Sequence, residues 1–400
     1  MVNVDSESFL AIAVVAALAA LLAGLMAGSR LPLPVVVIEI VLGIVIGPEL
    51  LGLAEPDDFV EFFSSLGLGM LFFFAGYEID FERIRGSPLR LAVLGWLLSL
   101  ALAYSLGALL EVSGVVLSLV FTGSALATTA IGTLIPILSD AGELRTRFGT
   151  FLLAAGAAGE FGPILLITLV FSTKSAASNA AILVLFIAVA VVAAVLAVRG
   201  VGRGWGLLER NLETSGQLAI RMAVVTVFAL GALASSLGLD LLLGGFVAGV
   251  IVRLALKGRE VHLFESKLIA VGYGFFIPFF FVVSGIQFDL DALVDDPVNL
   301  LKLPLFLALF LVVRGAPALL LYRKELDSRD RMALAIFSAT QLPMVVAITT
   351  IAVEEGHMRS STAASLIGAA ILSTTIFPIV GLRLRGGRAG EAGSPAATPA

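Results

Sequence analysis

The stretch LLAAGAAGEFGPILLITLVF, residues 152–171, is twenty residues long and holds one ionisable side chain, Glu160. A helix of about 20 apolar residues crosses the roughly 30 Å hydrocarbon core of a bilayer. A charged side chain near the centre of that core costs about 2.5–3.5 kcal/mol, so it must be protonated or paired. We therefore expect a membrane span here, with Glu160 as its functional residue.

Apolar segments of this kind recur along the whole chain. Hydrophobic residues make up 59% of it and charged residues 14%, with a mean hydropathy of +1.07, whereas soluble domains contain about 25% charged residues. We predict an all-α polytopic membrane protein with thirteen spans, centred near residues 19, 41, 69, 100, 127, 160, 188, 227, 248, 275, 313, 342 and 372. Because the chain has no cysteine, a disulfide framework and a thiolate metal site are excluded.

The basic residues are unevenly divided between the two sides of these spans. Of the 25 Lys and Arg residues, 21 lie in loops after odd-numbered spans or in the C-terminal segment, and 3 (Lys174, Lys302 and Arg359) lie in the other loops. The remaining one, Arg314, falls within the eleventh span. The positive-inside rule then places the N-terminus outside and the C-terminus in the cytoplasm. We expect a multi-pass protein of the plasma (inner) membrane.

A proline predicts a broken helix in the twelfth span, ALAIFSATQLPMVVAITTIAV (333–353). Pro343 removes a backbone donor and clashes with the preceding turn. Broken helices inside a bilayer are tolerated where protein buries them or where they line a watery cavity. The half-helix ends that they leave have dipoles and free carbonyls that can hold ions.

The fifth span, VVLSLVFTGSALATTAIGTLIPIL (115–138), predicts a matching interruption. Gly123 and the hydroxyls of Ser124, Thr128 and Thr129 gather at its middle. The fifth and twelfth spans are seven apart, so their orientations in the membrane are opposed. This predicts two inverted repeats, spans 1–6 and 8–13, joined by span 7, with the two discontinuous helices crossing near the midplane.

Four stretches resemble the monovalent cation:proton antiporter superfamily, particularly its second, mainly bacterial family. They are similar to its opening, acidic, broken-helix and late Phe-rich motifs, and they follow one another in the family's order: RLPLPVVVIEIVLGIVIGPELLGL (30–53), LGLGMLFFFAGYEIDFERIR (66–85), ALATTAIG (125–132) and FFIPFFFVVSGIQFDL (275–290). The resemblance implies a secondary antiporter that exchanges H⁺ for Na⁺ or K⁺ by alternating access. It also implies a homodimer, without cofactor or nucleic acid.

The resemblance further implies how the membrane domain, residues 1–384, is divided. Scaffold and dimer helices are expected at about 9–80 and 217–287, ion-binding core helices at about 88–172 and 302–384, and a linker helix at about 178–198. Residues 385–400 are rich in Gly, Ala and Pro and are expected to form a disordered cytoplasmic tail.

In the resembled family the sixth span carries an acidic pair or an amide–acid pair, and here those places hold Gly159 and Glu160. The resemblance implies that Glu160 is the essential carboxylate and that Arg314 stands where the family has a late basic residue, usually lysine. Because Gly159 supplies no second carboxylate, we expect one-for-one, electroneutral exchange.

Glu160 can hold a proton or a partly dehydrated cation, but not both at once. The alternative is a structural ion pair between Glu160 and Arg314 that locks two helices together. Arg314 stays charged at any relevant pH, so it is expected to pair with Glu160 or with carbonyl ends of the broken helices. It does not carry the proton.

The predicted ion and proton site consists of Glu160, Gly159, Thr128 and Thr129, because hard cations prefer oxygen ligands. For the two threonines the alternative is a hydrogen bond back to their own helix. A second set is expected to close the site or to form ordinary interhelix hydrogen bonds: Gln341, Ser338 and Ser124.

Three other functions compete with exchange. An enzyme is disfavoured because the loops show no nucleophile–base or metal-ligand cluster. A cation channel or uniporter on the same scaffold, and a sensory membrane protein that no longer transports, remain alternatives.

Overall fold

The structure, a computed structural model, describes residues 6–26, 33–79, 81–170, 176–239, 241–257 and 261–386. Within these ranges it contains helices and no strand, which confirms the predicted all-α class. The chain forms two compact units. The first comprises Met1–Ile79 and Ile164–Phe288, and the second comprises Asp80–Pro163 and Asp289–Ala400.

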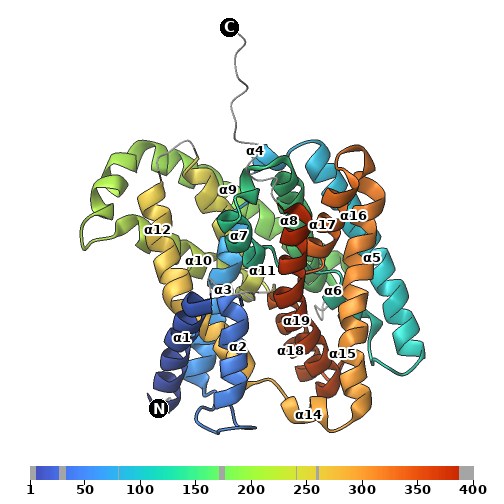
Figure 1. The fold of residues 1–400 in the computed structure, drawn as a ribbon. Coiled ribbons are helices and arrows are strands. Elements are labelled where there is room, and N and C mark those ends of the chain that lie inside the picture. Colours follow the sequence, from blue (N-terminus) through green and yellow to red (C-terminus); the bar gives the residue numbers. More distant parts are fainter. Residues whose placement is uncertain are drawn as a thin grey trace. The chain divides into compact units, whose positions relative to one another are not determined.

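The helices of the first unit are α1 (Ser6–Met26), α2 (Val35–Ile46), α3 (Asp58–Tyr77), α9 (Ala176–Leu212), α10 (Leu218–Ser236), α11 (Leu241–Ala255), α12 (His262–Val271), the π-helical turn η2 (Gly272–Phe276) and α13 (Ile277–Ile286). Those of the second are α4 (Phe81–Ile84), α5 (Ser87–Val112), α6 (Leu119–Leu126), α7 (Ile131–Asp140), η1 (Glu143–Arg145), most of α8 (Arg147–Val170), α14 (Leu290–Val294), α15 (Pro297–Phe310), the π-helical turn η3 (Leu311–Gly315), α16 (Ala316–Leu321), η4 (Tyr322–Lys324), α17 (Ser328–Ser338), α18 (Pro343–Glu354) and α19 (Ser360–Arg385). In the second unit α19, in red, runs beside α15, in orange (Figure 1).

Nine segments of the described chain are long and apolar enough to cross a membrane. They are Ser6–Met26, Asp58–Tyr77, Ser87–Val112, Ala181–Val201, Leu218–Ser236, His262–Ile286, Pro297–Lys324, Ser328–Glu354 and Ser360–Arg385. Shorter apolar helices occupy Val35–Ile46, Leu119–Ile135 and Leu242–Ala255. Each predicted centre falls within one of these segments or within α8, so the thirteen spans are confirmed as helices.

Glycines bring two helix pairs of the first unit into backbone contact. A Cβ on Gly43 of α2 would overlap with the Val282 carbonyl of α13, and one on Gly249 of α11 would overlap with the Phe73 carbonyl of α3. In the two predicted repeats, α2 and α11 are the second spans, and α3 and α12–α13 are the third spans. The same kind of contact therefore occurs twice, as an inverted repeat requires.

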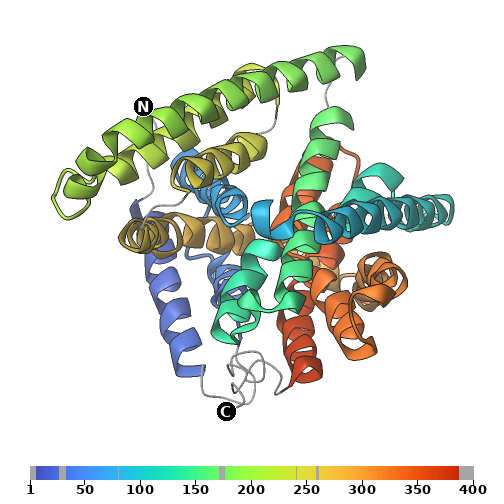
Figure 2. The same ribbon diagram turned by 90° about the horizontal axis from the view of Figure 1, so that it is seen from above.

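The helix predicted as a linker is longer than expected from the sequence. It was expected at about 178–198, but α9 continues to Leu212 and forms one extended helix, seen in green in Figure 2. The residues beyond 198 contain no proline to stop it. Lys267 of α12 donates to the Leu212 carbonyl, which satisfies an acceptor at the helix end.

Both predicted helix breaks are present in the second unit. Residues 127–130 separate α6 from α7, and residues 339–342 separate α17 from α18, so each break is 4 residues long. Pro343 is the first residue of α18, where its missing N–H costs no helical hydrogen bond. The two discontinuous helices of the inverted-repeat fold are thus confirmed.

A proline also explains the π-helical turn η3, which carries Arg314. Pro317 lies two residues beyond this turn and has no N–H to donate to the Val313 carbonyl, four residues earlier. Turns of this kind widen a helix locally and are frequent at functional sites. The same spacing recurs in the first unit, where Pro278 follows η2.

A buried ion-pair cluster ties together the ends of three segments of the second unit. Arg385, the last residue of α19, donates from Nε and Nη2 to both carboxylate oxygens of Glu143 in η1, at 3.0 and 2.8 Å. Its Nη1 donates to Asp330 of α17 at 2.6 Å, and its guanidinium stacks on the Phe148 ring. The helix therefore extends to the start of the tail predicted over 385–400; residues 387–400 lie outside the described residues.

Arg385→Ala is expected to lower the free energy of unfolding by about 3–5 kcal/mol, because it leaves the Glu143 carboxylate buried and unpaired. Thermal unfolding of the purified protein in detergent measures the loss. Arg383→Ala, an exposed arginine of the same helix, is the matched control and should unfold close to the wild-type temperature. Equal midpoints for the two variants would refute a stabilising role for the cluster.

Candidate functional site

The two helix breaks of the second unit are joined through their backbones. The Ala130 N–H donates to the Thr340 carbonyl at 2.9 Å, which links one break to the other. The Thr129 N–H donates to the Gly159 carbonyl of α8 at 3.1 Å. These bonds satisfy two N–H groups of the first break that a broken helix would otherwise leave unpaired in an apolar interior. The second contact places the first break against α8 next to Glu160.

Side chains of each break also cap the half-helix that ends at the other. The Thr129 hydroxyl donates to the carbonyl of Ser338, the last residue of α17, at 2.5 Å. The Gln341 amide donates to the carbonyl of Leu126, the last residue of α6, at 3.1 Å. These carbonyls belong to the negative ends of the two half-helices.

Glu160 lies in the interior of the second unit with an oxygen left unbonded. The residue is 2% exposed, and its Oε2 has no hydrogen-bond partner. The carboxyl contacts the backbone N–H of Gly132, in the first turn of α7. Amides at a helix N-terminus favour a negative group, so the carboxylate form has one stabilising contact. The free oxygen leaves room for a proton or a cation.

Arg314 does not pair with Glu160. The structure describes both residues, and the ion pair considered from the sequence is not formed between them. Its Nε donates to the Thr129 hydroxyl at 2.8 Å, its Nη1 to the Ser99 hydroxyl at 3.1 Å and its Nη2 to the Ala155 carbonyl at 3.1 Å. Arg314 was alternatively expected to bond carbonyl ends of the broken helices. It does bond a helix carbonyl, that of Ala155, but this carbonyl belongs to α8 and not to a broken helix. Ser99 of α5 was not foreseen.

Gly159 packs closely against the Arg314 guanidinium. A Cβ at this position would overlap with Nη2 of Arg314 and would lie 2.7 Å from the Thr129 hydroxyl oxygen. Gly156 and Gly162 make similar room on α8, for Ile131 and Trp96 respectively. The spacing of these three glycines is the sequence signal that would have revealed this close packing.

The other predicted ligands are in the second unit, and most of their polar atoms are occupied. The Thr128 hydroxyl donates to Gln341 Oε1 and the Ala125 carbonyl, at 2.7 and 3.0 Å. Ser124 donates to the Val120 carbonyl at 2.7 Å and lies 3.3 Å from the Tyr104 hydroxyl. The Ser338 hydroxyl is buried and has no hydrogen-bond partner.

Two further unbonded hydroxyls are not among the predicted site residues. Thr133, in the first turn of α7, and Thr340, in the second break, are buried and have no hydrogen-bond partner for Oγ1. Thr340 is one of the polar residues at the middle of the twelfth span, whereas Thr133 does not stand out, because threonine is common in spans. With Ser338 they leave three unsatisfied oxygens at or beside the breaks, and unsatisfied buried oxygens are suited to a cation or to water.

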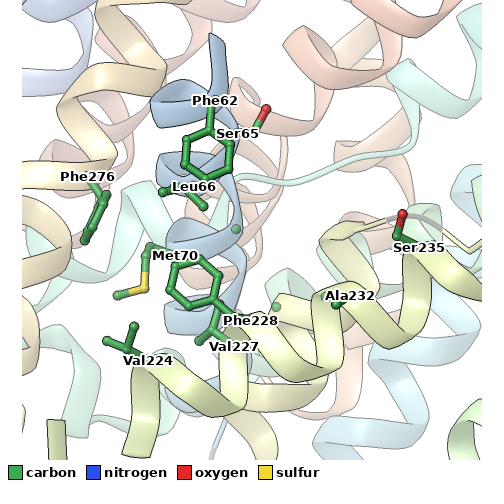
Figure 3. A pocket seen from close by; sticks show the side chains of 13 residues that line it. Phe62, Ser65, Leu66, Met70, Val224, Val227, Phe228, Ala232, Ser235 and Phe276 are labelled. Atoms are coloured by element: carbon green, nitrogen blue, oxygen red, sulfur yellow. The ribbon is translucent and has the colours of Figure 1, made fainter. Parts of the chain in front are cut away.

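A cavity of about 380 Å³ in the first unit is a poor alternative site for an ion. Its walls come from α3, α10, α11 and η2, and Figure 3 shows Phe62, Met70 and Phe228 among them. Ser65 and Ser235 are its polar side chains, and no acid or base lines it. Glu39 of α2, a buried acid of the first unit, is not among the lining residues.

Comparison with known proteins gives one consistent result. A family model described as sodium/hydrogen exchanger, transmembrane, matches residues 17–382. The Bacillus subtilis protein YjbQ is 27% identical over 93% of this chain, which spans 62% of that protein's length. The Na⁺/H⁺-K⁺ antiporter GerN of Bacillus cereus is 27% identical over 66% of this chain and 68% of its own.

Two other matches extend over most of both chains. The Na⁺/H⁺ antiporter of Enterococcus hirae is 25% identical over 88% of this chain and 91% of its own. The solved structure of the sodium proton antiporter MjNhaP1 from Methanocaldococcus jannaschii aligns with a TM-score of 0.61 and 16% identity, covering 97% of this chain and 98% of that one. At this identity the structural match speaks for the fold.

Proposed function

We propose that this chain, which belongs to the sodium/hydrogen exchanger family, is a secondary antiporter that exchanges H⁺ for Na⁺ or K⁺ across a membrane. The observation that carries the proposal is Glu160, a 2% exposed acid with an unbonded oxygen beside two helix breaks. A carboxyl in that setting needs a proton or a cation to neutralise it. Since one carboxyl cannot hold both, loading one ion releases the other.

The printed names of two relatives support these substrates. Both the Enterococcus hirae protein and GerN are named for Na⁺ and H⁺, and GerN also for K⁺. The chemistry of the breaks agrees, because the unbonded hydroxyls of Thr133, Ser338 and Thr340 are the hard oxygen ligands that such cations accept. Membership of a transporter family in turn argues against an enzyme.

Arg314 fits the role of a fixed charge. It stays protonated at any relevant pH, and three hydrogen bonds hold its guanidinium. Glu160 is neutral when it carries a proton, and its complex with a monovalent cation is neutral too. The loaded site then has the same net charge in both directions of transport, so exchange is one-for-one and electroneutral.

We further assign the ion-carrying movement to the second unit and the roles of scaffold and homodimer contact to the first. The support is that the predicted ion-site residues, Arg314 and Gln341 all belong to the second unit. The 21-to-3 division of basic residues supports an N-terminus outside and a C-terminus in the cytoplasm.

Exchange rates are expected to be independent of membrane potential. Purified protein in liposomes should move protons when Na⁺ is added outside, and at the same rate when a gradient of a membrane-permeant anion such as thiocyanate, with no K⁺ gradient, imposes 100 mV. That potential is worth about 2.3 kcal/mol for each net charge moved, so an electrogenic carrier would respond strongly. A voltage-dependent rate contradicts the stoichiometry, and cation current without proton movement favours a channel.

A further inference from the structure

Gln341 is the most heavily bonded residue of the second break. Its side chain donates from Nε2 to the Leu126 carbonyl at 3.1 Å and accepts at Oε1 from the Thr128 hydroxyl at 2.7 Å. Its N–H donates to the Ser373 hydroxyl at 3.0 Å. Its carbonyl accepts from the hydroxyls of Ser373 and Thr374, each at 3.0 Å. Because α19 fixes its backbone on one side, the carboxamide is held against the first break on the other.

The Gln341 amide bonds a carbonyl oxygen that is suited to bind a cation. Leu126 ends α6, and its carbonyl points from the negative end of that half-helix. Carbonyl oxygens are strong ligands for hard cations. Three residues further on, Thr129 bonds the backbone of α8 next to Glu160. The Leu126 carbonyl is thus the oxygen at which α6 enters the break that contacts α8 next to Glu160, and the amide hydrogen of Gln341 occupies it.

The opposite half-helix is closed in the same way. The carbonyl of Ser338, which ends α17, accepts from the Thr129 hydroxyl, and that hydroxyl in turn accepts from Arg314. Fixed donors of the protein thus satisfy both negative half-helix ends. A cation that arrives at Glu160 therefore does not find these two end carbonyls free, so water has to take the place of these ligands.

We propose that Gln341 is a specificity-determining residue: its carboxamide withholds the Leu126 carbonyl from the transported cation, so that the cation binds at Glu160 partly hydrated. The inference rests on the proposed exchange function and concerns the hydration of the cation at that site. A cation that retains water is recognised weakly by size, because a close-fitting shell of protein oxygens is what distinguishes ionic radii. The wild-type protein should accept Na⁺ and K⁺ with similar KM values.

Gln341→Glu is the sharpest test, because it keeps the shape of the side chain, removes the amide donor and preserves the acceptor for Thr128. When the new carboxyl is ionised, it and the Leu126 carbonyl face each other as two oxygens, which a cation can bridge. When it is protonated, its O–H can replace the amide N–H. At alkaline pH the KM for the cation should fall about tenfold or more and the Na⁺/K⁺ KM ratio should move away from one, the size of effect that one good contact gives. At acid pH both values should return to those of the wild type.

Thr349→Val is the matched control. Thr349 is a fully buried threonine of α18 whose hydroxyl donates to carbonyls of its own helix, Val345 and Val346. Its loss should leave the KM values for both cations and their ratio unchanged. A purely structural role of Gln341 would lower kcat without this pH-dependent change in KM.

A binding measurement keeps the test decisive if Gln341→Glu folds but transports poorly. The rise in unfolding temperature on adding NaCl or KCl, with choline chloride as reference, reports cation binding without transport. Gln341→Met, which frees the Leu126 carbonyl without adding charge, is the second variant, to be used also if Gln341→Glu does not fold. Stronger stabilisation by Na⁺ or K⁺ than in the wild type supports the proposal.

Unchanged KM values, selectivity and cation-dependent stabilisation in both folded variants would overturn the role of Gln341. Failure of the proposed function would look different, because the wild type itself would then show no proton-coupled cation flux.

Discussion

Proton-coupled cation exchange is expected to fall to the level of protein-free liposomes when Glu160 is replaced by glutamine. The amide has nearly the same volume, but it can neither take up a proton nor balance the charge of a cation. Because the site is buried, bulk water cannot take over either role. The measurement is proton flux into proteoliposomes, followed with a trapped pH dye, on addition of Na⁺ or K⁺.

Loss of exchange must be separated from loss of structure. Oε2 of Glu160 has no hydrogen-bond partner, so the glutamine variant gives up little and should unfold near the wild-type temperature. Glu160→Asp keeps the carboxyl but retracts it by one methylene, and should retain reduced, measurable exchange. Glu354→Gln changes an exposed acid of α18 and should transport normally. Normal exchange by Glu160→Gln would refute the single-carboxylate mechanism.

The features that the sequence predicted well are those with a local cause. Pro343 interrupts a helix wherever it is placed, because it lacks a backbone donor. Glu160 is conspicuous because an acid in an apolar run of membrane-spanning length needs a compensating function. Apolar stretches located the spans because a helix that crosses a membrane satisfies its own backbone hydrogen bonds, which is again a local property.

The partners of Arg314 had no such local cause. A guanidinium on a long side chain can reach several groups, and the π-helical turn before Pro317 changes the direction in which Arg314 leaves its helix. Its contacts with Ser99 and Ala155 join segments 215 and 159 residues away in the chain. Charge alone favoured Glu160, whereas the structure satisfies the arginine with hydroxyls and a carbonyl.

The reciprocal capping of the breaks was also beyond the reach of sequence reasoning. Polar residues at both breaks were noted, but which one meets which carbonyl depends on how the two segments cross. Gln341 and Leu126 are 215 residues apart in the chain, and Thr129 and Ser338 are 209 apart. A one-residue shift in either break would move these groups away from their partners.

Gly159→Ala is expected to reduce exchange by at least about tenfold, which corresponds to about 1.4 kcal/mol. The new methyl group would overlap with the Arg314 guanidinium and crowd the Thr129 hydroxyl. Overpacking of this kind costs about 1–3 kcal/mol. Displacing the guanidinium would also strain its bonds to Thr129, Ser99 and Ala155. Proteoliposome flux and thermal unfolding measure the two effects.

Gly95→Ala is the matched control, since a Cβ at that helical position of α5 would lie 3.7 Å from Pro317, an ordinary contact. It should transport normally. If the collision with Arg314 is the cause, the narrower head group of lysine should relieve it. The double variant, Gly159→Ala with Arg314→Lys, should then have a higher exchange rate than the rate calculated by multiplying the losses of the two single variants. Strict additivity would mean that residues 159 and 314 act independently, and close packing against Arg314 would then no longer explain why a glycine precedes Glu160.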